Sequence, residues 1–469
     1  MDTFEGYRSP FSWRYGTEAM RTLWSEAHKR RLWRRVWVAL AKAQSSFGLV
    51  TQEQVKELEA HADDIDMEQA MKLEEELRHD LMAELKTYAA QCPSAGGVLH
   101  LGATSMDIED NADALRIKES LLLIRESLAR LLAALASTIE RYAELPAMAF
   151  THLQPAEPTT LGYRYANYAQ DLCDTFEQLD AMIPSIKGKG FKGAVGTSAS
   201  YGELIGVAEL ERFESLLATS LGLEFFEAAT QTYPRIQDYR CLSLLAELGA
   251  ILHKMALDFR VLQIPLIGEV SEPFGKRQVG SSAMPFKRNP IESEKIDSLA
   301  RLLASYPQVA WSDAALSGLE RTLDDSANRR VILPESFLAC DELLRAMIRI
   351  VEGQRIDEEA VTRTAARFAP FSATERILMA MGKRGADRQA GHERLRDLAM
   401  IAWDAVRRGE ENPLLELVLQ DAYIASWLNA EEIRQLFDVG SYTGAAAKRA
   451  RKIAARARRL AERHAPHLK

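Results

Sequence analysis

The feature that most restricts the fold is an apolar seam within the proline-free stretch between Pro93 and Pro146. Along it, apolar residues recur at alternating spacings of three and four, the period of one face of an α-helix. The seam consists of Leu121, Ile124, Leu128, Leu131 and Leu135. A helix of about 30 residues spans on the order of 45 Å, far beyond the mean globular helix of about 12 residues. Such a helix needs partners of similar length, so the seam predicts a multi-helix bundle.

Proline positions and the same periodicity predict four further helices, and strand signals are almost absent. One should begin at Pro158 and end at Pro184, with Tyr165, Leu172 and Phe176 among its inward residues. The others are expected at 235–264, at 290 to about 311, and at 334 to about 352, where Gly353 is a C-cap. The prediction is therefore an all-α protein with a long central helical bundle.

Two segments rich in glycine and serine interrupt these helices: Lys187–Gly206 and Gly268–Pro290. Loops of this composition carry function more often than the core does. The first segment fits a functional loop and a plain hairpin or Ω-loop equally well. The second contains the string with the richest chemistry in the chain.

Composition and charge restrict the class of protein. Hydrophobic residues make up 47% and charged residues 27% of 469 residues, which is ordinary globular composition and excludes general disorder. The net charge of -8 gives no overall drive toward nucleic acid or anionic lipid. The basic tail Lys448–Lys469 fits a nucleic-acid contact less well than a solvated helix face. We expect no nucleic-acid partner and no membrane partner.

The cysteines and the N-terminus indicate the compartment. Cys92, Cys173, Cys241 and Cys340 are far apart and form no CxxC pair, so neither a zinc knuckle nor a disulfide framework is signalled. The N-terminus has no basic segment followed by an apolar one, and no apolar stretch is long enough to span a membrane. These features favour a reducing, cytoplasmic location.

The string GSSAMPFKRNP at 280–290 predicts an exposed loop that leads into a helix. Backbone N–H groups at the helix entrance, together with Lys287 and Arg288, can hold a carboxylate or phosphate. A serine in that environment gives up its proton more easily than in water. The string therefore predicts an anion site with a reactive serine, either Ser281 or Ser282.

Two histidines and one hydroxyl pair are further candidates. His152 lies in Thr151–Pro155 between two long helices and away from an apolar helix face, so it is a candidate acid or base, although this placement alone fits a non-catalytic histidine more often. His79, between Arg78 and Asp80, fits a site and a surface helix equally well. Thr104 and Ser105 precede the first long helix, where they suit either an anion site or an ordinary N-cap.

The string ERTLDDSANRR at 320–330 combines three arginines with neighbouring acids. Guanidinium groups suit bidentate recognition of carboxylate or phosphate. Magnesium at the acids is disfavoured because no third carboxylate or histidine follows at ligand spacing. Motifs for nucleotide hydrolysis, hydride transfer, zinc peptidases and serine hydrolases are absent from the sequence. An all-helical protein with serine, histidine and several anion-binding groups remains.

Taken together, these strings resemble the fumarase/aspartase superfamily and, within it, the adenylosuccinate lyase family. The resemblance is carried by GSSAMPFKRNP, THLQPAEPTT, HLGATS with Asp110 and Asn111, ERTLDDSANRR, YRSPFSWRY, LRHDLMAELK, QTYPR and PFSATERILMAMGKRGADRQAGHERLR. It implies a three-domain fold with boundaries near 1–105, 106–355 and 356–469, in keeping with a length that predicts roughly three domains. It also implies a homotetramer whose active sites combine loops of three subunits.

The resemblance further implies cleavage of a C–N bond by β-elimination, which releases fumarate from adenylosuccinate or from the succinylated aminoimidazole carboxamide nucleotide. No cofactor and no metal is implied. Ser281 would be the base, with Ser282 as the alternative, His152 the acid, and His79 a residue for orientation and charge. Residues implied to bind the succinyl carboxylates are Thr104, Ser105, Lys287 and Asn289. Residues implied to bind the nucleotide or its phosphate are Arg14, Tyr15, Arg78, Asp80, Gln231, Arg321, Ser326 and Arg330.

One position departs from the family pattern. Lys295 stands where the animal-type branch has arginine, which keeps the charge at an anion contact but loses the planar fork. Two other readings stay open. Argininosuccinate lyase would share the serine loop but would not need groups for a purine nucleotide phosphate. A non-enzymatic helical scaffold would keep the seams and lose part of the polar set.

Overall fold

The computed structural model describes residues 5–464. The chain divides into two compact units, each built from separate stretches of sequence. Unit 1 comprises residues 1–127, 175–252 and 298–345, and unit 2 comprises residues 128–174, 253–297 and 346–469. Five helices contribute to both units: α6 (Ser105–Arg141), α7 (Leu161–Ser185), α10 (Ile236–Leu262), α11 (Ile291–Leu303) and α13 (Asp324–Gly353).

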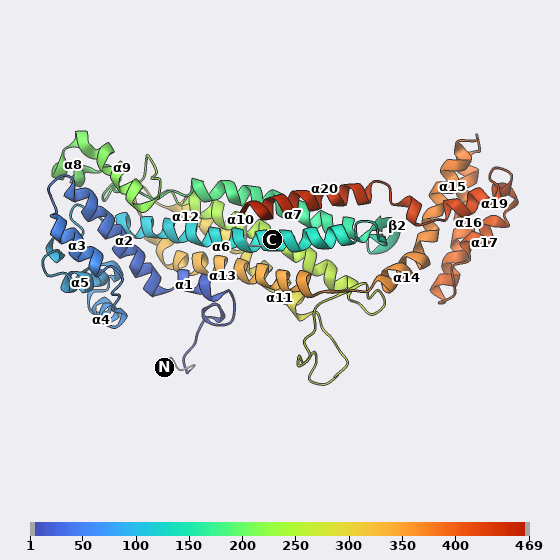
Figure 1. Cartoon of the computed structure of the whole chain (residues 1–469), viewed down its shortest axis with the longest axis horizontal. Coiled ribbons are helices and arrows are strands. Elements are labelled where there is room, and N and C mark those ends of the chain that lie inside the picture. The colour runs from blue at the N-terminus through green and yellow to red at the C-terminus, as the bar shows by residue number, and fades with distance from the viewer. Residues whose placement is uncertain (1–4, 465–469) are drawn as a thin grey trace. The chain divides into compact units, whose positions relative to one another are not determined.

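The remaining elements of unit 1 are helices, most of them short. They are η1 (Pro10–Ser12), α1 (Glu18–Leu23), α2 (Glu26–Ser45), α3 (Gln52–Ala60), α4 (Met67–Leu77), α5 (Asp80–Gln91), η2 (Gly96–Val98), α8 (Ala199–Ile205), η3 (Val207–Glu209), α9 (Leu210–Leu221) and α12 (Tyr306–Leu316). Helices α2 to α5 pack side by side (Figure 1). A buried ion pair joins two of these helices: Nε of Arg34 on α2 donates to Glu84 on α5 at 2.7 Å, and both side chains are fully buried.

Unit 2 contains the strands and the C-terminal helices. They are β1 (Pro146–Thr151), β2 (Gln154–Thr160), β3 (Val270–Ser271), β4 (Arg355–Ile356), α14 (Glu358–Phe368), η4 (Ala369–Ser372), α15 (Ala373–Gly382), α16 (Arg388–Arg407), α17 (Leu414–Leu419), α18 (Ala422–Ala425), α19 (Ala430–Leu436), η5 (Gly440–Tyr442) and α20 (Ala446–His464). Both strand pairs, β1 with β2 and β3 with β4, are antiparallel. Helices α15 to α19 gather around a separate apolar core that includes Ile377, Leu414 and Ile424 (Figure 1).

The apolar seams lie where the sequence predicts them. Every seam residue of α6 from Leu121 to Leu135 is fully buried, and so are Tyr165, Leu172 and Phe176 of α7. In the 27 residues of α10, Leu248 and Met255 are buried, whereas Tyr239 and Ile251 stay partly exposed. The all-α prediction is confirmed, with only a few short strands.

Four predicted boundaries are wrong, three of them at prolines. Pro158 pairs with Met148 inside the hairpin, and α7 begins only after Thr160, whose Oγ1 accepts the N–H of Tyr163 at 3.2 Å. A two-stranded hairpin has only edge strands, where proline is tolerated. The helix predicted from 290 breaks between α11 and α12, because Pro307 has no N–H to donate to Leu303.

The two remaining boundary errors are extra helical turns. Helix α13 begins at Asp324, ten residues before the predicted start, and keeps Pro334 in its interior. Ile332, Leu333 and Phe337 around that proline are buried, so packing outweighs the lost hydrogen bond. In the segment Lys187–Gly206, residues from Ala199 form α8, so the loop reading applies only up to 198.

The basic C-terminal segment forms α20. Ala450, Ala454 and Ala457 make its buried stripe, and Arg451 and Arg456 pair with Glu144 and Asp174 at 2.7 and 2.6 Å. These contacts agree with a solvated helix face. Residues 465–469 of the predicted tail lie outside the described part. Between residues 5 and 464, no helix has the length and apolar character needed to cross a membrane.

Candidate active site

Unit 1 contains a pocket of about 620 Å³ that collects most of the residues predicted for a site in this unit. Helices α4, α5, α6 and α13 and several connecting segments contribute to its lining. The predicted residues that line it are Arg78, His79, Asp80, Thr104, Ser105, Gln231, Arg321, Ser326 and Arg330. These positions are up to about 250 residues apart in sequence, so the fold brings together groups that the sequence keeps separate.

The start of α6 is held by the carboxylate of Asp107, which is fully buried. Its Oδ2 accepts the backbone N–H of Thr104 at 3.0 Å and the hydroxyl of Tyr201 at 3.2 Å. Its Oδ1 accepts from Lys189 Nζ at 2.5 Å and from the N–H of Gly193 at 3.2 Å. A carboxylate in the first turn also suits the positive end of the helix dipole. Asp107 therefore fixes the turn that carries Thr104 and Ser105.

The glycine-rich segment up to residue 198 is the other half of this arrangement. Lys189 is fully buried, and its Nζ also donates to Gly193 O at 2.8 Å. Asn111, one turn after Asp107, exchanges two hydrogen bonds with Gly190 at 3.0 and 3.1 Å. Ser200 at the start of α8 donates to Gly102 O at 2.6 Å. The segment thus braces the Leu101–Ser105 turn from outside the pocket.

His79 is the N-cap of α5. Its Nδ1 accepts the N–H of Met82 at 3.4 Å, and its Nε2 lies 3.5 Å from Ser105 Oγ. Because a neutral imidazole has one donor and one acceptor nitrogen, this contact places the proton on Nε2. His79 can therefore donate a hydrogen bond into the pocket beside Ser105.

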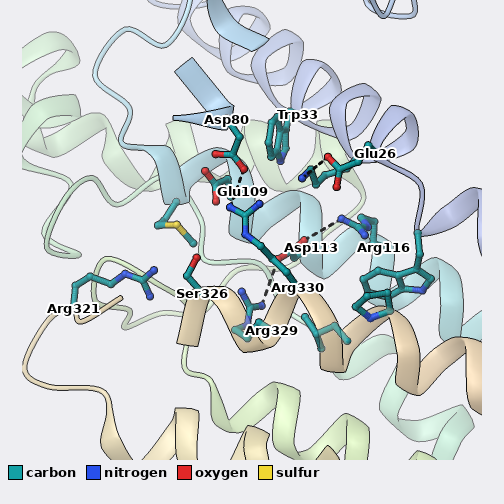
Figure 2. Close-up of a pocket in the computed structure, with 15 residues that line it drawn as sticks. Glu26, Trp33, Asp80, Glu109, Asp113, Arg116, Arg321, Ser326, Arg329 and Arg330 are labelled. Atoms are coloured by element: carbon teal, nitrogen blue, oxygen red, sulfur yellow. Dashed lines mark hydrogen bonds and ion pairs between the residues drawn. The ribbon is translucent and has the colours of Figure 1, made fainter. Parts of the chain in front are cut away.

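Asp80 and Arg330 form an ion pair across the pocket, with Arg330 Nη2 donating to Asp80 Oδ2 at 2.8 Å (Figure 2). Burial acts to raise the pKa of Asp80, but the charge and hydrogen bond of Arg330, together with the charge of Lys29 and the N–H of Leu81, hold the pKa below its usual range. The same pair raises the pKa of Arg330 against its own desolvation. The guanidinium is half-exposed, so it keeps donors for a ligand.

Beneath the pocket, a buried network orients Arg321. Asp325 accepts from Arg321 Nη1 at 2.8 Å and from Arg235 Nε at 2.6 Å. Arg235 in turn donates to Asp110 of α6 at 2.9 Å, and the N–H of Tyr233 donates to the same carboxylate at 2.7 Å. This network joins the QTYPR and ERTLDDSANRR strings to α6.

The two predicted residues near the N-terminus do not line this pocket. Arg14 lies over the ring of Trp13 at 5.6 Å, and Tyr15 packs edge-on against Phe11 at 5.7 Å. Their segment is held by α13, where Glu342 accepts the N–H of Gly16 at 3.2 Å. A role for Arg14 and Tyr15 in binding stays a prediction.

The remaining predicted residues belong to unit 2. His152 is exposed at the tip of the β1–β2 hairpin. His152 and Leu153 form its two-residue turn with φ of 54° and 58°, the left-handed backbone of a type I′ turn. Neither residue is glycine, so the turn holds strain, and such strain concentrates at functional sites.

The serine loop of unit 2 is ordered by its own contacts. Ser281 Oγ accepts the N–H groups of Ala283 and Met284 at 3.3 and 3.1 Å. Asn289 Nδ2 donates to Gly280 O at 2.9 Å, which closes the loop. Ser282 is exposed. A negative charge on Ser281 Oγ would thus meet two backbone donors.

Lys287 and Asn289 line a second cleft of about 650 Å³ between this loop and the end of α10. Lys287 is exposed. Lys295 pairs with Glu292 at 2.9 Å, on the helix that follows the loop. Glu272 caps that helix by accepting the N–H groups of Glu292 and Ser293 at 3.1 and 2.5 Å.

Sequence reasoning missed three residues of the unit 1 site. Asp107 and Lys189 hold the hydroxyl turn, and Glu109 lines the pocket. The spacing Thr104-x-x-Asp107 is a helix-start signal that identifies Asp107, and Glu109 lies four residues after Ser105 on the same helix face. Lys189 has no such local signal. Over the described residues, no group of three or more His, Cys, Asp or Glu side chains is placed to hold a metal ion.

Comparison with solved structures shows the fold, and a family model identifies the class of protein. The chain resembles a 3-carboxy-cis,cis-muconate lactonizing enzyme from Pseudomonas putida, with a TM-score of 0.85, 24% identity, and coverage of 96% of this chain and 99% of the other. A fumarate lyase from Mesorhizobium sp. BNC1 gives a TM-score of 0.82 at 24% identity with the same coverage. The family model described as "Lyase" matches residues 7–302. The chain is thus a lyase with the fumarase/aspartase fold.

Closer relatives define the family. Adenylosuccinate lyase of Schistosoma mansoni is 39% identical over 432 residues, 91% of this chain and 90% of that protein. Adenylosuccinate lyase of Saccharomyces cerevisiae is 37% identical over 462 residues, 97% of this chain and 95% of that protein. A model described as "Adenylosuccinate lyase C-terminus" matches residues 370–453. The chain belongs to the adenylosuccinate lyase family.

Proposed function

We propose that this chain cleaves adenylosuccinate to AMP and fumarate, and removes fumarate in the same way from the succinylated aminoimidazole carboxamide ribonucleotide of purine biosynthesis. One observation carries the proposal: hydroxyls at the start of α6, His79, and the cations Arg321 and Arg330 line one pocket. A succinylated nucleotide has carboxylates and a phosphate, and this lining offers donors for both.

The nucleotide half of the substrate would bind to α13 and the loop before it. Arg321, Ser326 and Arg330 suit the phosphate, since guanidinium and hydroxyl donors match its oxygens. Arg78, Asp80 and Gln231 would contact the rest of the nucleotide, together with Arg14 and Tyr15. The succinyl carboxylates would bind at Thr104 and Ser105, where the N-terminus of α6 adds N–H donors, and at Lys287 and Asn289.

The reaction is a β-elimination. A base removes a proton from the carbon beside one succinyl carboxylate, the C–N bond then breaks, and an acid gives a proton to the departing nitrogen. We assign the base to Ser281 rather than Ser282, because two backbone amides donate to Ser281 Oγ and stabilise its ionised form. Lys287 and Asn289 would stabilise the charge that develops on the carboxylate.

His152 would be the acid. Its exposed position at a strained hairpin tip supports this role, because the imidazole is free to approach a bound substrate. His79 would orient the substrate and supply a donor through Nε2. Lys295 would make a charged but less directional anion contact than arginine does. These steps need only proton transfer and cationic donors, so we propose no cofactor and no metal.

We also propose a homotetramer in the cytoplasm, with active sites shared between subunits and a three-domain division near residues 105 and 355. The long helices also keep large apolar side chains exposed, among them Leu122, Leu257 and Val331, and this supports an assembly that covers them. The predicted site residues fall in both units, which agrees with loops contributed to a shared site. The substrate is a small nucleotide, and no nucleic-acid or membrane partner is proposed.

An ultraviolet assay on purified protein tests the function. With chelator present, we expect turnover of adenylosuccinate and none of argininosuccinate. Replacing Ser281 or His152 with alanine should lower kcat by about 10²–10⁴-fold, the range for loss of an acid or base. Ser282→Ala is the matched control and should retain most activity. Light scattering should show a tetramer for every variant. Full activity of both Ser281→Ala and His152→Ala would overturn the assigned roles.

A further inference from the structure

One carboxyl group in the unit 1 pocket has no part in the chemistry above. Glu109 lies on α6, one turn after Ser105, and lines both the large pocket and a smaller cavity of about 110 Å³ beside it (Figure 2). Figure 2 shows its carboxyl group next to Asp80 and the guanidinium of Arg330. Within residues 5–464, Glu109 makes no hydrogen bond of its own and no ion pair within 4 Å.

The carboxylates around Glu109 already have cationic partners. Asp80 accepts from Arg330, Asp110 accepts from Arg235, and Asp113 lies 3.4 Å from Arg329. Burial, followed by the charges of Asp80, Asp113 and Asp110, raises the pKa of Glu109 to about 8, with Arg330 acting in the opposite direction. When it is protonated, Glu109 presents an O–H donor to the pocket.

Other charged groups face the same space without neutralising Glu109. From α2, Lys29 is paired with Glu26 at 2.6 Å. Arg321 is engaged by Asp325 at 2.8 Å. His79 lines the same pocket, and its Nδ1 accepts the N–H of Met82. Within the described part of the chain, Glu109 thus lies without a partner of its own beside Arg330, one of the cations proposed to hold the nucleotide phosphate.

We propose that Glu109 binds the phosphate group of the nucleotide as a hydrogen-bond donor, in its protonated form. The proposal rests on the proposed function, in which Arg321, Ser326 and Arg330 take the phosphate. A carboxyl O–H donating to an anionic oxygen is a strong, short hydrogen bond. An ionised Glu109 would instead place a like charge against the phosphate dianion.

Nucleotide binding must then depend on pH in one direction. Below pH 8, Glu109 is protonated and binds; above it, each binding event must first take up a proton. With a pKa of about 8, the dissociation constant for AMP should rise about tenfold between pH 7 and pH 9. The second pKa of a phosphate monoester is about 6, so the ligand stays dianionic over this range.

Isothermal titration of the whole protein with AMP tests the proposal. In wild type, the dissociation constant for AMP should rise about tenfold from pH 7 to pH 9. Glu109→Gln keeps a neutral donor of the same shape, so it should bind AMP at pH 7 within about threefold of wild type and show no weakening. Glu75→Gln, at an exposed carboxyl on the same pocket, is the matched control and should keep the wild-type dependence.

Two further measurements separate the outcomes. Adenosine, which lacks the phosphate, should bind with no pH dependence from Glu109; the same dependence for adenosine would overturn the phosphate assignment. Titrations of wild type at pH 8.5 in two buffers of different ionisation enthalpy should show that AMP binding takes up protons. If no protons are taken up, this measurement on the wild-type protein alone overturns the proposal. If AMP does not bind at pH 7, the proposed function itself fails, whereas binding with an equal pH dependence in Glu109→Gln refutes only the role of Glu109.

Discussion

Replacing Asp107 with asparagine removes one negative charge from a fully buried position and leaves the side-chain volume almost unchanged. The carboxylate accepts hydrogen bonds from Lys189 Nζ, Tyr201 and three backbone N–H groups. An asparagine offers one oxygen to these donors and turns its NH₂ toward the others. The ammonium of Lys189 would then keep Gly193 O as its acceptor, but no counter-charge.

Breaking a buried ion pair from one side costs about 3–5 kcal/mol, because the remaining charge stays desolvated. For a compact unit of some 150–250 residues, each kcal/mol lowers Tm by about 2–4 °C. We therefore expect Asp107→Asn to lower Tm by on the order of 10 °C. The released Thr104 N–H should also let the hydroxyl turn shift, with kcat/KM falling about tenfold, the upper range for one hydrogen bond.

Lys189→Met tests the other side of the same ion pair, because it removes the ammonium and leaves the carboxylate of Asp107 in place. Here the carboxylate loses the ammonium but keeps its backbone donors and Tyr201, so the cost should be only about 1–3 kcal/mol. Lys192→Met is the matched control on the same segment. Lys192 is also buried, but it pairs at 2.7 Å with Glu214, whose carboxylate is partly exposed and can regain water, so its loss should cost less than that of Lys189.

Differential scanning fluorimetry at one scan rate gives Tm, and the ultraviolet assay gives kcat/KM. The expected order of Tm loss is Asp107→Asn, then Lys189→Met, then Lys192→Met. A loss in Lys189→Met that equals or exceeds that of Asp107→Asn would refute the reasoning, since the backbone donors would then contribute nothing. A Tm for Asp107→Asn within 2 °C of wild type would do the same.

Three further predictions concern other parts of the chain. In Gly280→Ala, the added Cβ would lie 2.2 Å from Lys287 O, so the serine loop must move. We expect kcat to fall about 10²-fold while Tm stays unchanged, and an unchanged kcat would contradict this prediction. All four thiols are buried, and burial raises the pKa of Cys92 to about 11, so Ellman's reagent should titrate less than one thiol in native protein and four in guanidinium chloride. The hydrogen bond from Arg384 lowers the pKa of Glu432 from 4.5 to about 2, so this pair adds stability above pH 4.5 that is lost toward pH 2; urea midpoints of Glu432→Gln and wild type should differ at pH 6 and converge at pH 2.

The sequence predicted the long helices well because burial in a bundle and helical periodicity agree along them. Leu121, Ile124 and Leu128 of α6 are fully buried, as their spacing requires. The errors occur where proline has more than one structural use. Pro158 was read as a helix start but lies in an edge strand, and Pro334 was read the same way but lies inside α13. Local propensity cannot separate these cases, because tertiary packing decides them.

For the site, motif strings predicted the residues that line the pocket better than the residues that hold them in place. Thr104, Ser105 and Arg330 lie in strings with recognisable chemistry, and they line one pocket. Lys189 is 82 positions from its partner Asp107, and no periodicity connects the two. Such long-range ion pairs become visible only when the chain is folded, which is why the brace of the hydroxyl turn was not predicted.

The first turns of α6 explain why a buried helix begins with so many polar residues. On an α-helix, residues four apart share a face. Ser105 and Glu109 face the pocket, while Asp107 and Asn111 face the glycine-rich segment and bond to it. Asp110 accepts a hydrogen bond from Arg235, which is joined to Arg321 through Asp325. One helix start thus sets the position of the hydroxyls, the pocket carboxyl and Arg321 together, so a shift in any of its braces should be felt by all three.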